Sequence, residues 1–464
     1  MSKKKIHRLR KKSTAAQSSA AINPEAHPDA AGIDVGAEEL VVAVPRGRGT
    51  GATVRTFSAF TRGLRALRGW LLDCGIKTVA IESTGNYWIN IYDLLEEAGM
   101  EVYLVNARYV KAVPGRKTDV SDAQWLQHLH AAGLLKKSFR PLQPVVPLRY
   151  LMRHRQTLVQ EASSHVQRMQ KVLTEMNLKI QHVFSDVDGQ SAQAIITAIL
   201  AGERAAAKLA ALRDWRCRTP LPKILEALEG HYREEYLFVL KLSQTAWHQT
   251  RDALAACDEQ IARLAARVTG ETEEPLPPAP AAERRMAKNA PDMPVYEEAW
   301  RFYGVDLGRV PGVGPGLLTA LMSEIGTGGE LLKAFPEAEN VTSWAGLCPD
   351  NRISGGKVLK AKTRKVPSRL AAALRLAAQG VSRANNRMGD YCRKMKGRLG
   401  KAEGIVATAH KLMRIIYGMI KSRQPYDETI AFRVTPATLQ RRLKHLHKQA
   451  AALGFQLTPA TNAA

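Results

Sequence analysis

Cysteine is scarce in this sequence, and its few occurrences are never closely paired. Five residues are spread over 464 positions, and no Cys-x-x-Cys spacing of the kind that binds zinc occurs. The odd number also argues against a framework of disulfides, so we expect the reduced thiols of a cytosolic protein. The five residues are Cys74, Cys217, Cys257, Cys348 and Cys392.

Long apolar runs are also missing. No stretch reaches the roughly 18 residues that a membrane-spanning helix requires, and no basic-then-apolar signal segment precedes the first expected strand. Acidic residues are few as well, because 43 Asp and Glu stand against 68 Lys and Arg, which gives a formal net charge of +25 and a pI near 10.0. Such an excess points to a polyanion, either nucleic acid or an anionic membrane surface. We expect nucleic acid and no membrane partner.

What is present is enough for a folded protein of several domains. Hydrophobic residues make up 45% of the chain. Apolar runs at 32–36, 40–44 and 53–57 predict an antiparallel meander, and a helix at 61–74 follows. Strands at 77–81 and 101–105 alternate with a helix at 88–98. This order predicts a mixed sheet with helices on its faces.

The rest of the chain is predicted to be mainly helical. Apolar residues repeat every 3.5 positions from Leu158 to Met176 and every seven from Leu240 to Val268, which indicates long helices with coiled-coil seams. Six prolines between 275 and 294 indicate a linker. The expected parts are a disordered basic arm (1–28), the α/β domain (29–146), a coiled-coil helical insertion (147–270), the linker (271–296), a helical domain (297–432) and a basic C-terminal helix and tail (433–464).

Four acidic residues are candidates for chemistry. Asp119 and Asp122 are three residues apart before an apolar-periodic run, so on a helix they would share one face. The plain alternative is that Asp119 caps the helix and Asp122 is a first-turn acid. Asp34 lies in the first expected strand and Glu82 ends another. Two strand acids with two helix acids suit a Mg²⁺ site that catalyses phosphoryl transfer.

Two glycine-rich segments are candidates for phosphate contacts. The turn with Gly312 and Gly314 opens a helix and resembles a helix-hairpin-helix, although a plain interhelical turn is the alternative. Ser354 is followed by two glycines among cations, so we expect an open loop whose hydroxyl attacks or binds a phosphate. The candidate nucleic-acid contacts are Gly312, Gly314, Arg352, Gly355, Gly356, Lys357, Lys360, Lys362 and Arg364.

Taken together, these motifs resemble those of transposases of the insertion-sequence one-ten family, which are DEDD-type recombinases guided by a bridge RNA. The motifs occur in the family's order and cover about 30–140 and 305–420. They are GIDV at 32–35, ESTGNYW at 82–88, KTDVSDA at 117–123, VPGVG at 310–314, GLCP at 346–349 and SGGK at 354–357.

The resemblance implies a RuvC-like, ribonuclease-H-like first domain and a helical transposase domain with a catalytic serine. Asp34, Glu82, Asp119 and Asp122 would bind one or two Mg²⁺ ions, and Ser354 would form a phosphoserine link with DNA. The implied partners are donor and target DNA, a structured bridge RNA and further copies of the chain in a dimer or tetramer. The implied location is the cytoplasm, at the nucleoid of a bacterium or archaeon.

The sequence departs from the family at two places. Relatives often carry Lys-Gly-Asn before the helix that follows the serine, whereas Lys365-Val366-Pro367-Ser368 stands here, and the segment from 180 to 300 is longer than usual. Two other functions stay open. One is a metal-dependent junction resolvase in which Ser354 only contacts phosphate, and the other is a non-catalytic nucleic-acid-binding protein.

Overall fold

The computed structural model describes residues 26–48, 52–82, 85–106, 110, 121–270, 287–360, 363–364, 366–433 and 436–458. The chain divides into two compact units, Met1–Arg140 and Pro141–Ala464. Within the described residues, no helix is long and apolar enough to cross a bilayer.

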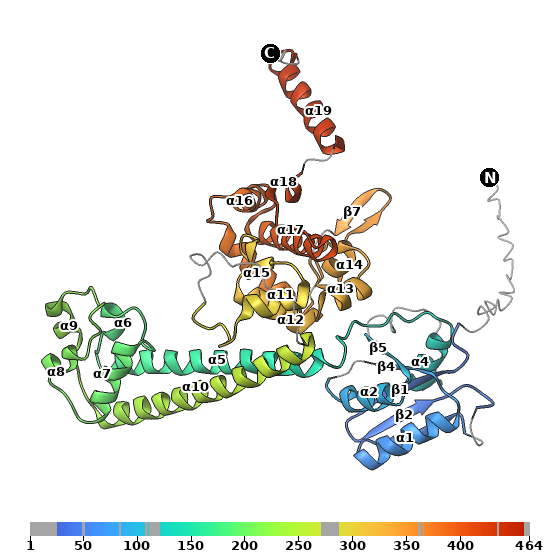
Figure 1. Ribbon diagram of the computed structural model, residues 1–464, viewed down its shortest axis with the longest axis horizontal. Helices are drawn as coiled ribbons and strands as arrows, with labels where there is room; N and C mark the ends of the chain where they lie inside the picture. Colours follow the sequence, from blue (N-terminus) through green and yellow to red (C-terminus); the bar gives the residue numbers. More distant parts are fainter. Residues whose placement is uncertain are drawn as a thin grey trace, which may run out of the picture. The chain divides into compact units, whose positions relative to one another are not determined.

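The first unit is built on a five-stranded sheet in the order β3-β2-β1-β4-β5 (Figure 1). Strands β1, β2 and β3 form an antiparallel meander, whereas β1, β4 and β5 are parallel. The predicted mixed sheet is therefore confirmed. The elements are β1 (Ala30–Val35), β2 (Glu39–Ala43), β3 (Val54–Ser58), α1 (Thr61–Asp73), β4 (Thr78–Glu82), α2 (Trp88–Glu97), β5 (Glu101–Val105) and α4 (Asp122–Ala131).

Helices cover both faces of this sheet. Side chains alternate along a strand, so Ile33 and Ile81 share one face, where they are fully buried with Leu67 of α1 and Leu95 of α2. The opposite face contains Ala80 and is covered by α4, which buries Leu126 against it. The sheet is consequently apolar on both sides, and the acidic residues at its edge are exceptions that need a reason.

Two long helices dominate the start of the second unit. α5 (Val145–Glu175) and α10 (Glu234–Thr269) lie side by side and run in opposite directions (Figure 1). A buried ion pair joins them, since the Arg155 guanidinium binds the Asp258 carboxylate and also donates to the Asn289 and Ala290 carbonyls at 2.9 Å. The predicted pair of long helices is present, and its coiled-coil seam stays a prediction.

Short helices close the far end of this arm. They share a core with the ends of the long helices, in which Met176, Ile195 and Leu228 are fully buried. These short helices lie within the segment 147–270 that was predicted to be helical. They are α6 (Ile180–Val183), α7 (Gln190–Leu200), α8 (Ala206–Ala211) and α9 (Leu221–Ala227).

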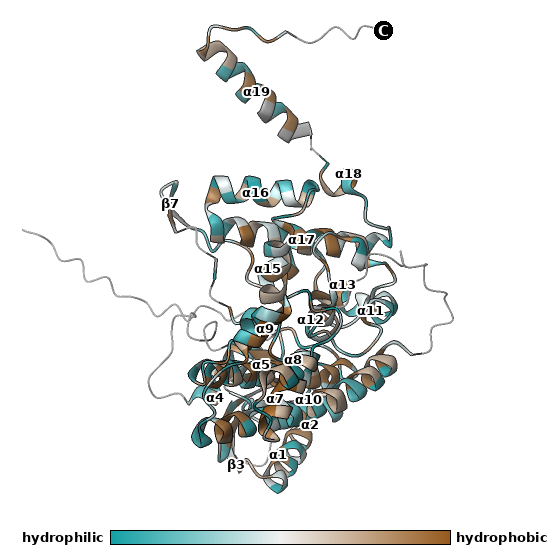
Figure 2. Cartoon of the chain, turned by 90° about the vertical axis from the view of Figure 1, so that its left-hand side faces the viewer, coloured by the Kyte–Doolittle hydropathy of each residue, from teal (hydrophilic) through white to brown (hydrophobic). Residues whose placement is uncertain are grey.

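The remainder of the second unit is a helical cluster around α17 (Lys401–Ser422), which contacts α14, α15 and α16. Hydrophobic and hydrophilic residues are interspersed along the last helix, α19 (Figure 2). The other elements are α11 (Val295–Tyr303), η1 (Leu307–Arg309), α12 (Pro315–Ile325), α13 (Gly328–Ala334), α14 (Ala338–Trp344), β6 (Arg352–Ser354), β7 (Lys357–Lys360), α15 (Arg369–Val381), α16 (Arg387–Leu399), α18 (Glu428–Ala431) and α19 (Pro436–Ala452).

Candidate functional site

Two of the candidate acids are neighbours at one edge of the sheet. Ile33 of β1 pairs with Ile81 of the parallel strand β4, so the next residues along these strands, Asp34 and Glu82, stand side by side. Because Ile33 and Ile81 face the core under α1 and α2, alternation directs Asp34 and Glu82 to the opposite face, which α4 covers. Strand register thus brings together two carboxylates that are far apart in sequence.

The third candidate acid begins the helix on that face. α4 starts at Asp122, and Ser121 is its N-cap. The Ser121 hydroxyl accepts from the Gln124 N–H at 3.3 Å, and the Gln124 side-chain oxygen accepts from the Ser121 N–H at 3.2 Å, which is a capping box. Because Ser121 is the cap, the alternative that Asp119 caps this helix is wrong, whereas the placement of Asp119 and Asp122 on one face stays a prediction. Asp119 itself lies outside the described residues.

Asp34 and Asp122 are close enough to repel each other. Partial burial raises the pKa of Asp34 above its ordinary value, and the negative charge of Asp122 raises this pKa further. The Val35 N–H acts in the opposite direction by hydrogen bonding to the carboxylate. A partly buried carboxylate whose ionised form is disfavoured by a neighbouring like charge is typical of a site that accommodates a cation.

A close contact between β1 and α4 makes this arrangement possible. A Cβ atom on Gly32 would lie 2.3 Å from the Ala123 carbonyl oxygen and 2.4 Å from the Gln127 nitrogen, so only glycine lets the helix approach this closely. The Gln127 amide also donates to the Ala30 carbonyl oxygen at 3.3 Å. Sequence reasoning missed both positioning residues, although a glycine inside a strand is a known sign of close backbone approach.

The described acids fit a hard divalent ion in their chemistry, since carboxylate oxygens are its preferred donors. Among the described residues, no three His, Cys, Asp or Glu side chains gather as a metal cluster. Asp119, the fourth candidate ligand, is outside those residues, so the complete quartet stays a prediction.

Ser354 lies in the second unit, at the end of a short β-hairpin. It is the last residue of β6 and pairs with Lys357 of β7, so the expected open loop is wrong at this position. Gly355 and Gly356 have φ values of +54° and +75°, as a two-residue type I′ turn requires at both central positions. Ser354 is nevertheless exposed. The glycines therefore serve the turn, and the turn presents the serine to solvent.

The cationic candidates around the hairpin differ in their surroundings. Lys357 is exposed next to the turn. In the backbone register of the two strands, Arg352 lies opposite Lys360. Arg364 donates to the carbonyl and, at 3.2 Å, to the hydroxyl oxygen of Ser343 in α14, so it is already engaged within the chain. Lys362 lies outside the described residues. Phosphate binding by this group stays a prediction.

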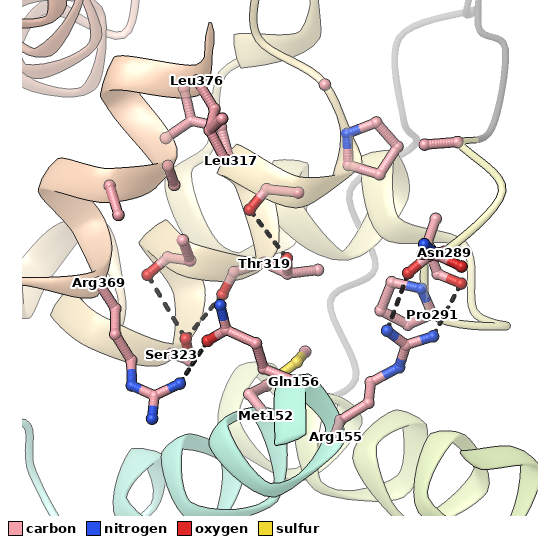
Figure 3. Close-up of a pocket in the computed structure, with 18 of the residues that line it drawn as sticks. Met152, Arg155, Gln156, Asn289, Pro291, Leu317, Thr319, Ser323, Arg369 and Leu376 are labelled. Carbon is pink, nitrogen blue, oxygen red and sulfur yellow. Dashed lines mark hydrogen bonds between the residues drawn. The ribbon is translucent and has the colours of Figure 1, made fainter. Parts of the chain in front are cut away.

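The glycine-rich turn before α12 borders a cavity of about 530 Å³ between α5, α12 and α15 (Figure 3). Gly312 has φ +90°, and a Cβ there would lie 2.3 Å from Val381, so this glycine serves helix packing. Gly314 caps α12 with open space around it. The arginines on the cavity wall already have partners: Arg369 donates to Gln156, and Arg153 donates to Glu324 at 2.7 and 2.9 Å.

Two family models match this chain, over separate ranges. The first is a DEDD transposase model described as "Transposase", and it covers residues 31–178. The second is described as "Transposase IS116/IS110/IS902 family" and covers residues 306–393. No curated protein matches the chain.

Both matches, with the acidic sheet edge, define the class: the chain is a DNA transposase, an enzyme that cuts and rejoins DNA. Its five-stranded mixed sheet with covering helices is consistent with a RuvC-like DEDD domain, and that domain suggests dependence on a divalent metal. Within the class, the chain belongs to the IS110 family of insertion-sequence transposases.

Proposed function

We propose that this transposase cuts and rejoins DNA at a composite site made of an acidic quartet and a serine nucleophile. The quartet is Asp34, Glu82, Asp119 and Asp122, which would hold one or two Mg²⁺ ions, and the nucleophile is Ser354. The observation that carries the proposal is the crowding of Asp34 and Asp122: burial raises the pKa of Asp34, and repulsion by the Asp122 charge raises it further. A bound divalent ion relieves that repulsion.

Each group has a defined part in the proposed reaction. The bound metal would neutralise charge on the phosphodiester and stabilise the leaving oxygen. The Ser354 hydroxyl oxygen attacks phosphorus while its proton passes to solvent. The bond from phosphorus to one sugar oxygen breaks, and that oxygen leaves as a hydroxyl. The step exchanges one phosphate ester bond for another, so no ester bond is lost. A hydroxyl of a second DNA end can therefore attack the phosphoserine, release Ser354 and join the strands.

The acids and the serine belong to different compact units of the chain, Met1–Arg140 and Pro141–Ala464. We propose that the acidic quartet of one protomer acts with Ser354 of another, which makes the enzyme an oligomer, either a dimer or a tetramer. The family resemblance supports this arrangement.

The serine chemistry is tested by following a DNA adduct that survives denaturation. Ser354→Ala is expected to abolish the adduct and strand joining, while DNA binding stays within about twofold, because an exposed hydroxyl contributes little to a charge-dominated affinity. The matched control is Ser422→Ala, which removes another exposed hydroxyl from the same unit. If Ser354→Ala still forms the adduct at the wild-type rate, the chain is better described as a metal-only nuclease.

A bridge RNA is proposed as the source of sequence recognition. The net charge of +25 suits backbone binding of RNA and DNA, and no obvious base-reading motif occurs in the sequence. The transposase purified from its native element is expected to carry one structured RNA encoded beside its own gene. Sequencing the co-purified RNA checks this, and a heterogeneous mixture of cellular RNA would count against guidance.

A further inference from the structure

A tryptophan at the far end of the helical arm is almost fully exposed. Trp215 lies in the loop between α8 and α9, and 89% of its surface is accessible. Tryptophan is normally among the more buried residues, and no apolar contact in the loop hides this ring. The loop belongs to the segment between the two ranges that the family models match.

The loop around Trp215 is held by hydrogen bonds on both sides. The Asp214 N–H donates to the Ser191 hydroxyl at 2.8 Å, and the Thr219 hydroxyl donates to the Val183 carbonyl oxygen at 2.7 Å. Asp214 also accepts two hydrogen bonds from the Arg216 side chain, at 2.8 and 2.9 Å. The ring is therefore presented from an ordered turn, which lowers the entropy lost when a ligand stacks on it.

The surroundings of the ring are cationic. Arg213, Arg216 and Arg218 are all exposed, and the Arg216 guanidinium is 6.0 Å from the centre of the Trp215 ring. Within residues 212–220 the one acid is Asp214, and it is paired with Arg216. An aromatic face flanked by arginines suits an unpaired base, whose ring stacks while its phosphates meet the guanidinium groups. The formal net charge of +25 favours a polyanionic partner over a protein.

We propose that the Trp215 loop, residues 212–220, binds single-stranded nucleic acid by stacking an unpaired base on Trp215. The flanking phosphates lie against Arg213 and Arg218. Nucleic acid as the partner rests on the proposed function, whereas the stacking contact requires neither metal nor cleavage. Loss of stacking and loss of strand cutting are therefore separable results.

The test uses the full chain without divalent metal, in about 0.5 M salt so that backbone contacts elsewhere are screened. The probes are a 20-nucleotide single-stranded DNA, the matching RNA and a blunt DNA duplex, and iodouracil in each strand allows photo-crosslinking. We expect the crosslinked peptide from either single strand to contain Trp215. Trp215→Ala should weaken single-strand binding about tenfold, while Trp215→Phe stays within about threefold.

The matched control is Phe238→Ala. Phe238 is a 63% exposed aromatic residue on α10 of the same arm, but the first turn of its helix contains two acids, Glu234 and Glu235. It should leave single-strand binding unchanged. If Trp215→Ala weakens binding of one single strand more than of the other, the result supports the proposal and shows whether the bound strand is RNA or DNA. Crosslinks that map elsewhere, unchanged single-strand binding by Trp215→Ala, or an equal loss for the duplex would overturn it.

Discussion

At the scale of single residues, Asp34 is held where its charge is disfavoured. Burial removes part of its hydration, and Asp122 adds a like charge, so the pKa of Asp34 is raised in the folded chain. A carboxylate in this state destabilises the metal-free protein and binds a cation well. The site thus trades folding stability for binding, as functional sites often do.

Replacing this residue is expected to stabilise the metal-free chain at neutral pH. Because the folded pKa lies above the ordinary value of 3.8, the penalty is full above the raised pKa and fades as the pH falls through it. Asp34→Asn should therefore raise the thermal midpoint at pH 7, with the gain vanishing near pH 3. Mg²⁺ should raise the midpoint of the wild type and leave that of Asp34→Asn unchanged.

Thermal unfolding with and without Mg²⁺ measures both effects, and Glu38→Gln, a change at an exposed acid of the same unit, is the control. A metal-free Asp34→Asn variant that is less stable than the wild type at pH 7 would show that the Asp34 carboxylate supports the fold rather than strains it.

The positions of individual acids were only partly predictable. Asp34 and Glu82 were correctly expected on strands, because polar residues at the ends of apolar runs stand out. The start of α4 differs from the predicted cap at Asp119, since the capping box of Ser121 and Gln124 starts the helix at Asp122. The Ser-x-x-Gln pattern of this capping box can be seen in the sequence, but the pair of carboxylates beside it is more conspicuous.

At the scale of elements, the docking of α4 on β1 sets the distance between Asp122 and Asp34. Gly32 is the point of closest approach, next to the Ala123 carbonyl. No periodicity reveals this contact, because it joins backbone atoms of segments about ninety residues apart. The sequence predicts that both elements exist and leaves their separation undetermined.

Gly32→Ala is expected to push α4 away from the sheet. The added methyl group meets backbone atoms that cannot rotate aside, so the unfolding free energy should fall by about 1–3 kcal/mol and Mn²⁺ affinity by at least tenfold. Chemical denaturation and isothermal titration measure the two quantities. Gly69→Ala in α1, where a Cβ meets nothing within 4 Å, should keep metal affinity and gain slight stability. Wild-type Mn²⁺ affinity in folded Gly32→Ala would refute this positioning role.

The helical arm and the serine hairpin also show which features of an element the sequence does not reveal. Apolar spacing predicted both long helices, but the buried pair of Arg155 and Asp258 that joins them depends on a partner about one hundred residues away. The hairpin was missed because the basic residues around Ser354 conceal strand alternation. Two consecutive glycines between short extended runs are a hairpin signal, but the same pair is also typical of an open loop.

At the scale of the whole molecule, the chain combines a small α/β unit that carries the acids with a larger helical unit that carries Ser354. The net charge and the motif order predicted a DNA-processing enzyme, and the two family matches confirm a transposase. Neither composition nor periodicity can tell which copy of the chain supplies each half of the site, because that depends on assembly between molecules.

The central claim is most directly tested by mixing two inactive variants. Asp122→Asn removes one half of the proposed site, and Ser354→Ala removes the other. If the acids of one protomer act with the serine of another, mixed oligomers contain intact sites, so the mixture should regain the DNA adduct that neither variant forms alone. The measurement is adduct formation after co-refolding of the two variants. A mixture as inactive as its components, although the chains are shown to associate, would contradict a site shared between protomers.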